Sequence, residues 1–251
     1  MVKTQSYLTP KGMVGLWTDF VDWEKRKKGE ESFFTNKLKE NGCKVILDTA
    51  LGGGYESINL IKNKFQVYSN EIDNDFKNLA LINANKNNVI LNIKNCDWRE
   101  LSKCYNIQFD ALICLGNSFT YMLKKEDQIT ALKEMYFLLR KGGILIIDHR
   151  NYDYMLNNKK EALINFKYSR KYYYCGELVS GYPIEINNNY VVMEWKHHKK
   201  NESYRLKLYP FRAEEMFSLL KAVGFKKVET YYDFNKEKPE HFDFVQHIAV
   251  K

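Results

Sequence analysis

The sequence predicts an α/β fold in which a mostly parallel sheet is flanked by helices. From residue 44 onward, short apolar β-branched segments alternate with segments of helical periodicity, which is the pattern of parallel strands joined by crossover helices. The chain has 251 residues, of which 45% are hydrophobic, enough for one sizeable core. Proline is rare, with four residues, which argues against long disordered linkers. We therefore expect a single domain over residues 1–251.

The expected strands of the first half are short and apolar, as buried parallel strands are. They are Lys44–Thr49, Phe65–Glu71, Val89–Ile93, Asp110–Leu115 and Gly143–Asp148. Helical spacing predicts crossover helices at Glu56–Asn63, Asp73–Lys86 and Lys125–Arg140. The last helix runs into the stop signal Lys-Gly-Gly. We expect this core over residues 42–150, with a helical cap over residues 1–41.

The sequence changes in character after Asp148. Residues 151–210 are rich in Tyr and Asn, and Tyr190–Lys196 and Tyr204–Tyr209 alternate in the manner of antiparallel strands. We expect this stretch to form an inserted antiparallel lid. A helix at Arg212–Val223 and strands at Lys227–Tyr232 and Phe244–Val250 are expected to return the chain to the main sheet over residues 211–251.

The net charge of +8 is compatible with an anionic partner such as nucleic acid. The lysines are scattered and interleaved with Asn rather than gathered in one basic stripe, so a nucleic-acid partner is not expected. No stretch approaches the ~20 apolar residues of a membrane helix, and the first residues contain no apolar leader. The five cysteines lie far apart without a CxxC pair. These features favour a cytoplasmic protein in a reducing compartment.

A glycine-rich turn directly follows the first expected strand. Asp48 leads through Thr49-Ala50-Leu51 into Gly52-Gly53-Gly54 and then a helix, so the backbone can approach a ligand closely. Glu71 ends the second strand, where a carboxylate can accept both ribose hydroxyls of an adenosine cofactor. The alternatives are a tight strand-to-helix connection and an exposed acid at a strand end.

The turn lacks the spacing of a dinucleotide-binding loop. Ala50 occupies the position of the first glycine, and Ser57 stands three residues after Gly54. A pyrophosphate requires a closer approach to the helix N-terminus than a nucleoside without phosphates does. Adenosine attached to an amino acid therefore fits this turn better.

Three further strand ends carry polar residues. Asp97 and Trp98 follow the third strand, where a carboxylate and an indole can frame an adenine ring; a helix cap and a core aromatic are the alternative interpretation. Leu115 and Asn117 follow the fourth strand, and a charged stretch with Arg150 follows the fifth. Ligands of open α/β sheets bind at such carboxyl ends.

Several longer strings resemble the glycine N-methyltransferase and glycine/sarcosine N-methyltransferase family. They are Asp22–Arg26 (DWEKR), Leu47–Gly54 (LDTALGGG), Cys96–Leu101 (CDWREL), Asp110–Met122 (DALICLGNSFTYM) and Gly142–Leu156 (GGILIIDHRNYDYML). The resemblance extends over almost the whole chain. It implies a Rossmann-like class I methyltransferase fold with a seven-stranded sheet, and S-adenosyl-L-methionine as the cofactor.

The resemblance also implies roles for individual residues. Trp17 and Arg26 would close over the methionine end of the cofactor, with Glu71 on the ribose and Asp97 and Trp98 on the adenine. The remaining cofactor-binding residues would be Asp48, Ala50, Gly52, Gly54 and Leu115. Arg150 would clamp the carboxylate of the acceptor, Asn117 would orient it, and Tyr174 and Tyr209 would line the acceptor site. For the two tyrosines, strand packing is an equally good interpretation.

These residues suit methyl transfer to a small amine that carries a carboxylate. An in-line displacement at a sulfonium needs a neutral, well-placed amine, and an arginine can hold the carboxylate by paired charge-assisted bonds. No metal is needed. We expect glycine or sarcosine as the acceptor and allow for a homo-oligomer. The sequence departs from the family at Gly53, and at Glu237 in place of a tyrosine. Another small amine, or a cofactor-binding regulator without turnover, is the alternative.

Overall fold

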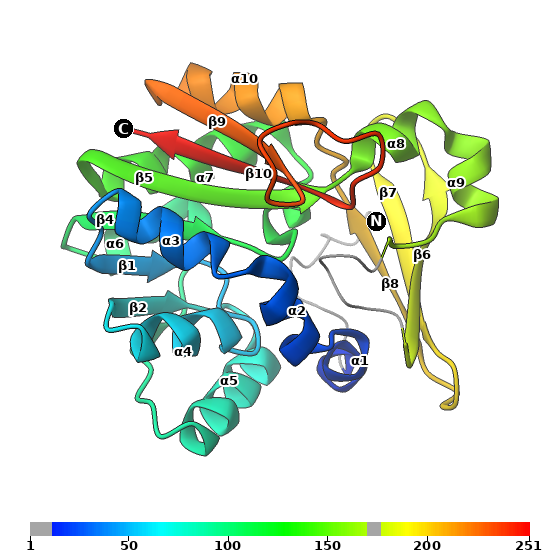
Figure 1. The fold of residues 1–251 in the computed structure, drawn as a ribbon, viewed down its shortest axis with the longest axis horizontal. Helices are drawn as coiled ribbons and strands as arrows, with labels where there is room; N and C mark the ends of the chain where they lie inside the picture. Colours follow the sequence, from blue (N-terminus) through cyan, green and yellow to red (C-terminus); the bar gives the residue numbers. More distant parts are fainter. Residues whose placement is uncertain (1–11, 170–176) are drawn as a thin grey trace, which may run out of the picture.

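The computed structural model describes residues 12–169 and 177–251 (Figure 1). Its main sheet has seven strands in the order β3-β2-β1-β4-β5-β10-β9. The strands are β1 Val45–Asp48, β2 Gln66–Asn70, β3 Ile93–Lys94, β4 Phe109–Cys114, β5 Leu139–Arg150, β9 Lys227–Tyr232 and β10 Phe244–Val250. Neighbouring strands are parallel from β3 to β5, and β10 is antiparallel to both β5 and β9. The predicted fold class is confirmed.

Helices cover both faces of this sheet (Figure 1). They are α1 Met13–Phe20, α2 Trp23–Glu30, α3 Phe33–Glu40, α4 Tyr55–Lys62, α5 Asn74–Lys86, α6 Leu101–Cys104, α7 Lys125–Leu138, α8 Tyr152–Asn157, α9 Lys159–Asn165 and α10 Ala213–Val223. Alternate residues of a strand point to opposite faces. Accordingly Leu47 of β1 packs in the cluster that holds α7 and α10, and Ile46 packs in the cluster that holds α3 and α4.

A second, antiparallel sheet contains β6 Val179–Ile186, β7 Val191–His197 and β8 Ser203–Leu208. Helix α1 joins its core, since Met13, Leu16 and Phe20 are buried together with Trp195. Asp19 of α1 also bonds Lys200 Nζ at 2.5 Å. The first helix of the predicted cap is therefore built into the core of the lid.

Two strands, β3 and β5, begin several residues away from the positions predicted from the sequence. Strand β3 is only Ile93–Lys94, where the sequence predicts Val89–Ile93. Ile90 is 92% exposed, so burial of its side chain does not stabilise a strand there. Strand β5 begins at Leu139, so the Lys-Gly-Gly string lies inside the strand rather than ending a helix at Arg140. At Gly143 a Cβ would lie 2.9 Å from the Arg140 carbonyl oxygen, which explains why the glycine is needed there.

The cysteine pairing was not expected from the sequence. Cys96 and Cys104 form a disulfide, with Cα atoms 6.5 Å apart, although they belong to no CxxC motif. The thiols of Cys43 and Cys114 are free and buried. The fold brings Cys96 and Cys104 together because α6 turns the chain back beside the end of β3.

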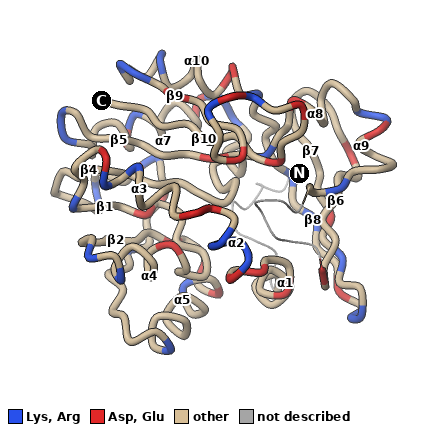
Figure 2. Tube along the Cα trace, viewed as in Figure 1, with Lys and Arg blue, Asp and Glu red and all other residues tan. Residues whose placement is uncertain are grey.

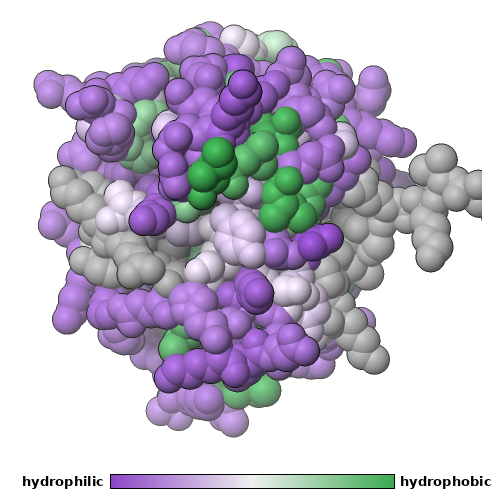
Figure 3. Space-filling view, turned by 90° about the vertical axis from the view of Figure 1, so that its right-hand side faces the viewer, coloured by the Kyte–Doolittle hydropathy of each residue, from purple (hydrophilic) through white to green (hydrophobic). Residues whose placement is uncertain are grey.

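The surface of the described residues carries mixed charge and, on one face, an apolar patch. Lys and Arg are spread over many elements rather than gathered in one stripe (Figure 2). Green apolar side chains gather on the face that contains α9 and β6 (Figure 3), where Leu163 and Ile164 are exposed. A groove there includes both residues and shares none of its described lining with the cleft treated below. Within the described part of the chain, no helix has the length and apolarity required to cross a membrane.

Candidate active site

The main cleft lies at the carboxyl ends of β1, β2, β4 and β5, opposite the lid sheet. Loops after the parallel strands supply one side, and α1, β7 and β8 supply the other. The lining residues that were predicted as site residues are Trp17, Ala50, Gly52, Glu71, Asp97, Trp98, Asn117 and Arg150. Residues distant in the sequence thus meet where ligands of open α/β sheets bind.

Glu71 is fixed against the glycine-rich turn. Its Oε2 accepts a bond from Gly52 N at 2.8 Å, and its Oε1 accepts one from Asp73 N at 2.8 Å. Burial raises the pKa of the Glu71 carboxyl to about 7, and these two backbone donors oppose that rise. Each oxygen keeps acceptor capacity for a hydroxyl, so the geometry suits a ribose.

Buried hydrogen bonds to Asp48 support the glycine-rich turn. Asp48 is 3% exposed and accepts from Ser57 Oγ at 2.8 Å and from Ala50 N at 3.2 Å. Gly54 has φ +81° and is the N-cap of α4, and a Cβ there would lie 3.0 Å from Ala80 Cβ. Asp48, Gly54 and the buried Leu115 do not line the cleft, so we assign them to shaping the turn and the strand end.

Asp97 and Trp98 form another part of the wall. Trp98 Nε1 donates to the Thr49 carbonyl oxygen at 2.7 Å, and its ring stacks near Phe119 with centroids 5.9 Å apart. Asp97 accepts from Arg99 through the side chain and through the backbone N–H, and the side-chain bond is the main cause that lowers the pKa of Asp97. An apolar ring and a carboxylate of lowered pKa therefore lie side by side on the wall of the cleft.

Arg150 and Asn117 lie together at another part of the cleft, where the Asn117 side chain bonds the backbone N–H of Arg150. Asn117 Oδ1 accepts from Arg150 N at 3.0 Å, and Asn117 Nδ2 donates to Tyr152 Oη at 3.0 Å. Arg150 is 3% exposed, its Nη1 donates to Tyr168 Oη, and its guanidinium lies over the rings of Tyr168 and Phe244. The guanidinium is thereby held on an aromatic support while Arg150 lines the cleft.

Other predicted residues are placed elsewhere or lie outside the described chain. Arg26 is buried, bonds Glu30 Oε1 at 2.6 Å and lies 5.0 Å from the Trp23 ring centroid, so it does not line the cleft. Tyr209 Oη donates to Glu215 Oε1 at 2.7 Å and also lies outside the lining. Glu237 is exposed in the loop between β9 and β10. Tyr174 falls outside the described residues.

Several lining residues from α1, the lid sheet and the segment around Asn117 were not predicted from the sequence. They include Met13, Tyr121, Met122, Trp195, Leu206 and Leu208. Trp195 belongs to the alternating segment from which β7 was predicted. The alternation predicts a strand, but it does not say which side chains face the cleft. Tyr168, the partner of Arg150, was also missed. Together the six lining side chains make this side of the cleft largely apolar.

Comparison with known proteins bears on this cleft. Residues 46–143 match the family model described as a methyltransferase domain. The glycine/sarcosine N-methyltransferase of Halorhodospira halochloris is 36% identical over 249 residues, and the alignment covers 99% of this chain and 90% of the relative. The chain belongs to the glycine/sarcosine N-methyltransferase family. The glycine/sarcosine/dimethylglycine N-methyltransferase of Actinopolyspora halophila is 37% identical over 96% of this chain, which spans 42% of that relative's length.

Solved structures agree on the fold of this family member. An S-adenosylmethionine-dependent methyltransferase from Clostridium acetobutylicum has a TM-score of 0.71 at 18% identity, covering 92% of each chain. The PH0226 protein of Pyrococcus horikoshii has a TM-score of 0.69 at 20% identity, covering 96% of this chain and 100% of that one. These structures confirm the predicted fold, and the membership in the glycine/sarcosine N-methyltransferase family confirms the predicted enzyme class, an S-adenosylmethionine-dependent methyltransferase.

Proposed function

We propose that this enzyme transfers a methyl group from S-adenosylmethionine to the amine of glycine or sarcosine. The observation that carries this proposal is the buried guanidinium of Arg150 on the wall of the same cleft as Glu71. An arginine with a planar fork is well suited to a carboxylate, and a buried cation favours a substrate that brings the opposite charge. The names of the curated relatives point to the same acceptors.

The residues present fit the cofactor. Glu71 offers both carboxylate oxygens beside Gly52, whose φ of +52° and missing side chain leave room at the turn. Trp98, Ile72 and Phe76 give the lining an apolar surface suited to a purine ring. When bound, the cofactor supplies an electrophilic methyl carbon on a sulfonium.

The contribution of the chain to catalysis is positioning. Arg150 would bind the acceptor carboxylate, and Asn117 would keep Arg150 in place through the bond to its backbone N–H. The apolar residues Met13, Trp195 and Leu206 would exclude water around the amine. Holding the nitrogen in line with the methyl carbon converts a bimolecular encounter into an effectively unimolecular step.

A small-molecule acceptor also fits better than a nucleic acid, because the lining of the cleft is largely apolar and the lysines are scattered over the surface (Figure 2). The test is a screen with S-adenosylhomocysteine formation as the readout. Glycine, sarcosine and dimethylglycine are compared with methylamine and dimethylamine, which lack the carboxylate. We expect turnover with glycine, sarcosine or both, and little with the simple amines.

Equal turnover of amino acids and their decarboxylated counterparts would overturn the carboxylate assignment. Turnover of an amino sugar alone would indicate a different acceptor class. Tight binding of S-adenosylhomocysteine without turnover of any amine would favour a cofactor-binding regulator.

A further inference from the structure

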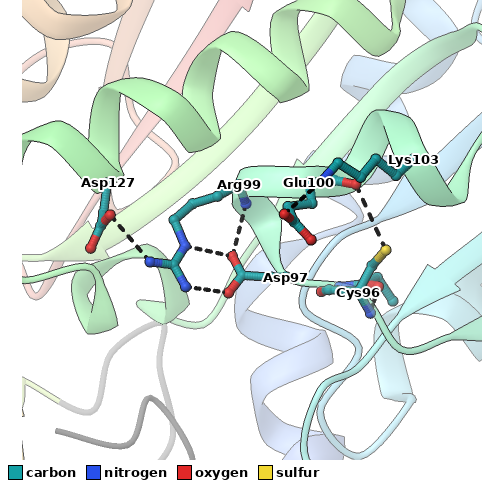
Figure 4. Close-up of polar contacts among 7 residues, drawn as sticks. Cys96, Asp97, Arg99, Glu100, Lys103 and Asp127 are labelled. Carbon is teal, nitrogen blue, oxygen red and sulfur yellow. Dashed lines mark hydrogen bonds and ion pairs between the residues drawn. The ribbon is translucent and has the colours of Figure 1, made fainter. Parts of the chain in front are cut away.

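Arg99 connects the cleft residue Asp97 to the first turn of α7. Its Nε and Nη2 donate to Oδ1 and Oδ2 of Asp97 at 2.9 and 2.5 Å, and its Nη1 donates to Asp127 Oδ1 at 3.2 Å (Figure 4). The guanidinium thus bridges two carboxylates, one on the cleft wall and one on a helix. Arg99 itself is not among the residues that line the cleft.

The hydrogen bonds that Asp97 accepts determine how many lone-pair positions its carboxylate keeps for a ligand. Among the described residues, Oδ1 accepts two bonds, from the backbone N–H and the Nε of Arg99, and Oδ2 accepts one. A carboxylate oxygen has about two lone-pair positions. Both positions on Oδ1 are therefore used, and Oδ2 has one left for a donor in the cleft.

The second carboxylate gives this arrangement a rigid anchor. Asp127 lies in the first turn of α7, and α7 packs into the main core through Leu132 and Met135. A bidentate arginine fixes the plane of a carboxylate as well as its charge. Because one guanidinium serves both carboxylates, the orientation of Asp97 is tied to the packed helix rather than to its own short loop.

We propose that Arg99 is a positioning residue that makes the cleft select a 6-amino purine over a 6-oxo purine, by holding Asp97 with one acceptor position for the exocyclic amino group. A 6-oxo group presents an acceptor to that same position, and the donor of such a base, its N1–H, lies one ring atom away from it. This proposal shares one premise with the proposed function, namely that the adenosyl end of the cofactor binds beside Asp97.

The test compares the affinity of two ligands by calorimetric titration: S-adenosylhomocysteine and its 6-oxo analogue, S-inosylhomocysteine. We expect the wild-type enzyme to prefer the adenosyl ligand by about 10- to 100-fold, the range that one hydrogen bond to a charged group supports. In Arg99→Ala the preference should fall about tenfold, mainly through weaker binding of the adenosyl ligand. Arg99→Lys keeps the charge without the fork and should lie between the two.

Two further variants make the test specific. Asp127→Asn removes the anchor without changing Asp97 and should lower the preference in the same direction, by less. Arg140→Ala is the matched control, because Arg140 pairs with Asp110, whose carboxylate also caps backbone N–H groups, outside the cleft. That variant should keep the wild-type preference even where its melting temperature drops.

If Arg99 only stabilised the fold, its replacement would not change the preference for S-adenosylhomocysteine over S-inosylhomocysteine. An unchanged preference in folded Arg99→Ala, or an equal loss of affinity for both ligands, would overturn the proposal. A wild-type enzyme that binds neither ligand would overturn this proposal and the proposed function together. Retained purine selectivity with no methyl transfer to any amino acid would overturn the proposed function alone.

Discussion

Arg150 donates a hydrogen bond from Nη1 to the hydroxyl of Tyr168, and its guanidinium carbon lies 4.8 Å from the centroid of the same ring. The two residues come from different elements, since Arg150 ends β5 and Tyr168 follows α9. Tyr168 therefore supports the guanidinium both through its ring and through its hydroxyl. This support bears on how well an acceptor carboxylate can be held.

Replacing Arg150 by lysine tests the clamp directly. Lysine keeps the positive charge but loses the planar, bidentate fork, so the acceptor KM should rise by about tenfold or more, the size expected for a lost hydrogen bond to a charged group. The kcat should fall as well if the clamp sets the line of attack. Steady-state kinetics with glycine and sarcosine would measure both, and calorimetry should show nearly unchanged affinity for S-adenosylhomocysteine.

The matched control is Arg205→Lys, because Arg205 forms an exposed ion pair with Glu194 on the lid sheet. Its kinetics should stay close to those of the wild type. Wild-type acceptor kinetics in Arg150→Lys would show that the clamp assignment is wrong.

Replacing Tyr168 by phenylalanine removes the hydroxyl and keeps the ring under the guanidinium. One hydrogen bond contributes about 0.5–1.5 kcal/mol, so the acceptor KM should rise about two- to tenfold, while cofactor affinity should not change. Tyr190→Phe is the control, since Tyr190 bonds Glu185 and carries Lys207 over its ring on the lid surface. If both variants raise the KM equally, Tyr168 has no special role in holding Arg150.

Replacing Glu71 by alanine should weaken binding of S-adenosylhomocysteine about ten- to a hundredfold, because charge-assisted bonds of about 1.5–3 kcal/mol are removed. The fold should survive, since the carboxylate lies on the wall of the cleft. Asp75→Ala, at an exposed acid in the first turn of α5, is the control. Calorimetric affinity equal to that of the wild type would place the ribose elsewhere.

The affinity for S-adenosylhomocysteine should also depend on the ionisation of Glu71. The pKa of this carboxyl is raised by burial to about 7, so the fraction that is ionised, and able to accept from two hydroxyls, grows as the pH rises through 7. The dissociation constant should therefore fall between pH 6 and pH 8. In Glu71→Gln this dependence should disappear; a slope that persists there would have to come from another group.

The buried pair His149 and His247 predicts a loss of stability in acid. Their Nε2 atoms lie 3.3 Å apart, and burial lowers the pKa of His149 to about 4 and that of His247 well below its usual value. The unfolded chain, with histidine pKa values near 6.5, therefore binds more protons than the folded chain. The free energy of unfolding contributed by His149 is complete above pH 6.5 and declines toward pH 4, by up to about 1.4 kcal/mol per pH unit.

Urea unfolding at pH 7.5, 5.5 and 4.5 would measure this decline. His149→Gln should show a shallower decline than the wild type, whatever its absolute stability. The comparison is needed because burial raises the pKa of Asp48 to about 6, and that group changes stability in the opposite direction as the pH falls. Parallel pH profiles in the two proteins would contradict the prediction.

The sequence by itself determined the main sheet and most of the cofactor side of the cleft. Runs of apolar residues marked the parallel strands, and the carboxyl ends of parallel strands meet at one edge. Ala50 and Gly52 follow β1, Glu71 follows β2, Asp97 follows β3 and Arg150 ends β5, and yet all of them line one cleft. Local patterns were sufficient there because each residue is placed by the strand that precedes it.

The tertiary structure alone decided the other side. Alternation in β7 and β8 predicted strands but not that Trp195 and Leu206 face the cleft, nor that Tyr209 turns away to Glu215. Arg99 bridges Asp97 to Asp127 of α7, through a contact that no single segment encodes. Side-chain direction in these cases depends on the partner offered by a distant element, and packing between elements determines that partner only once the chain has folded.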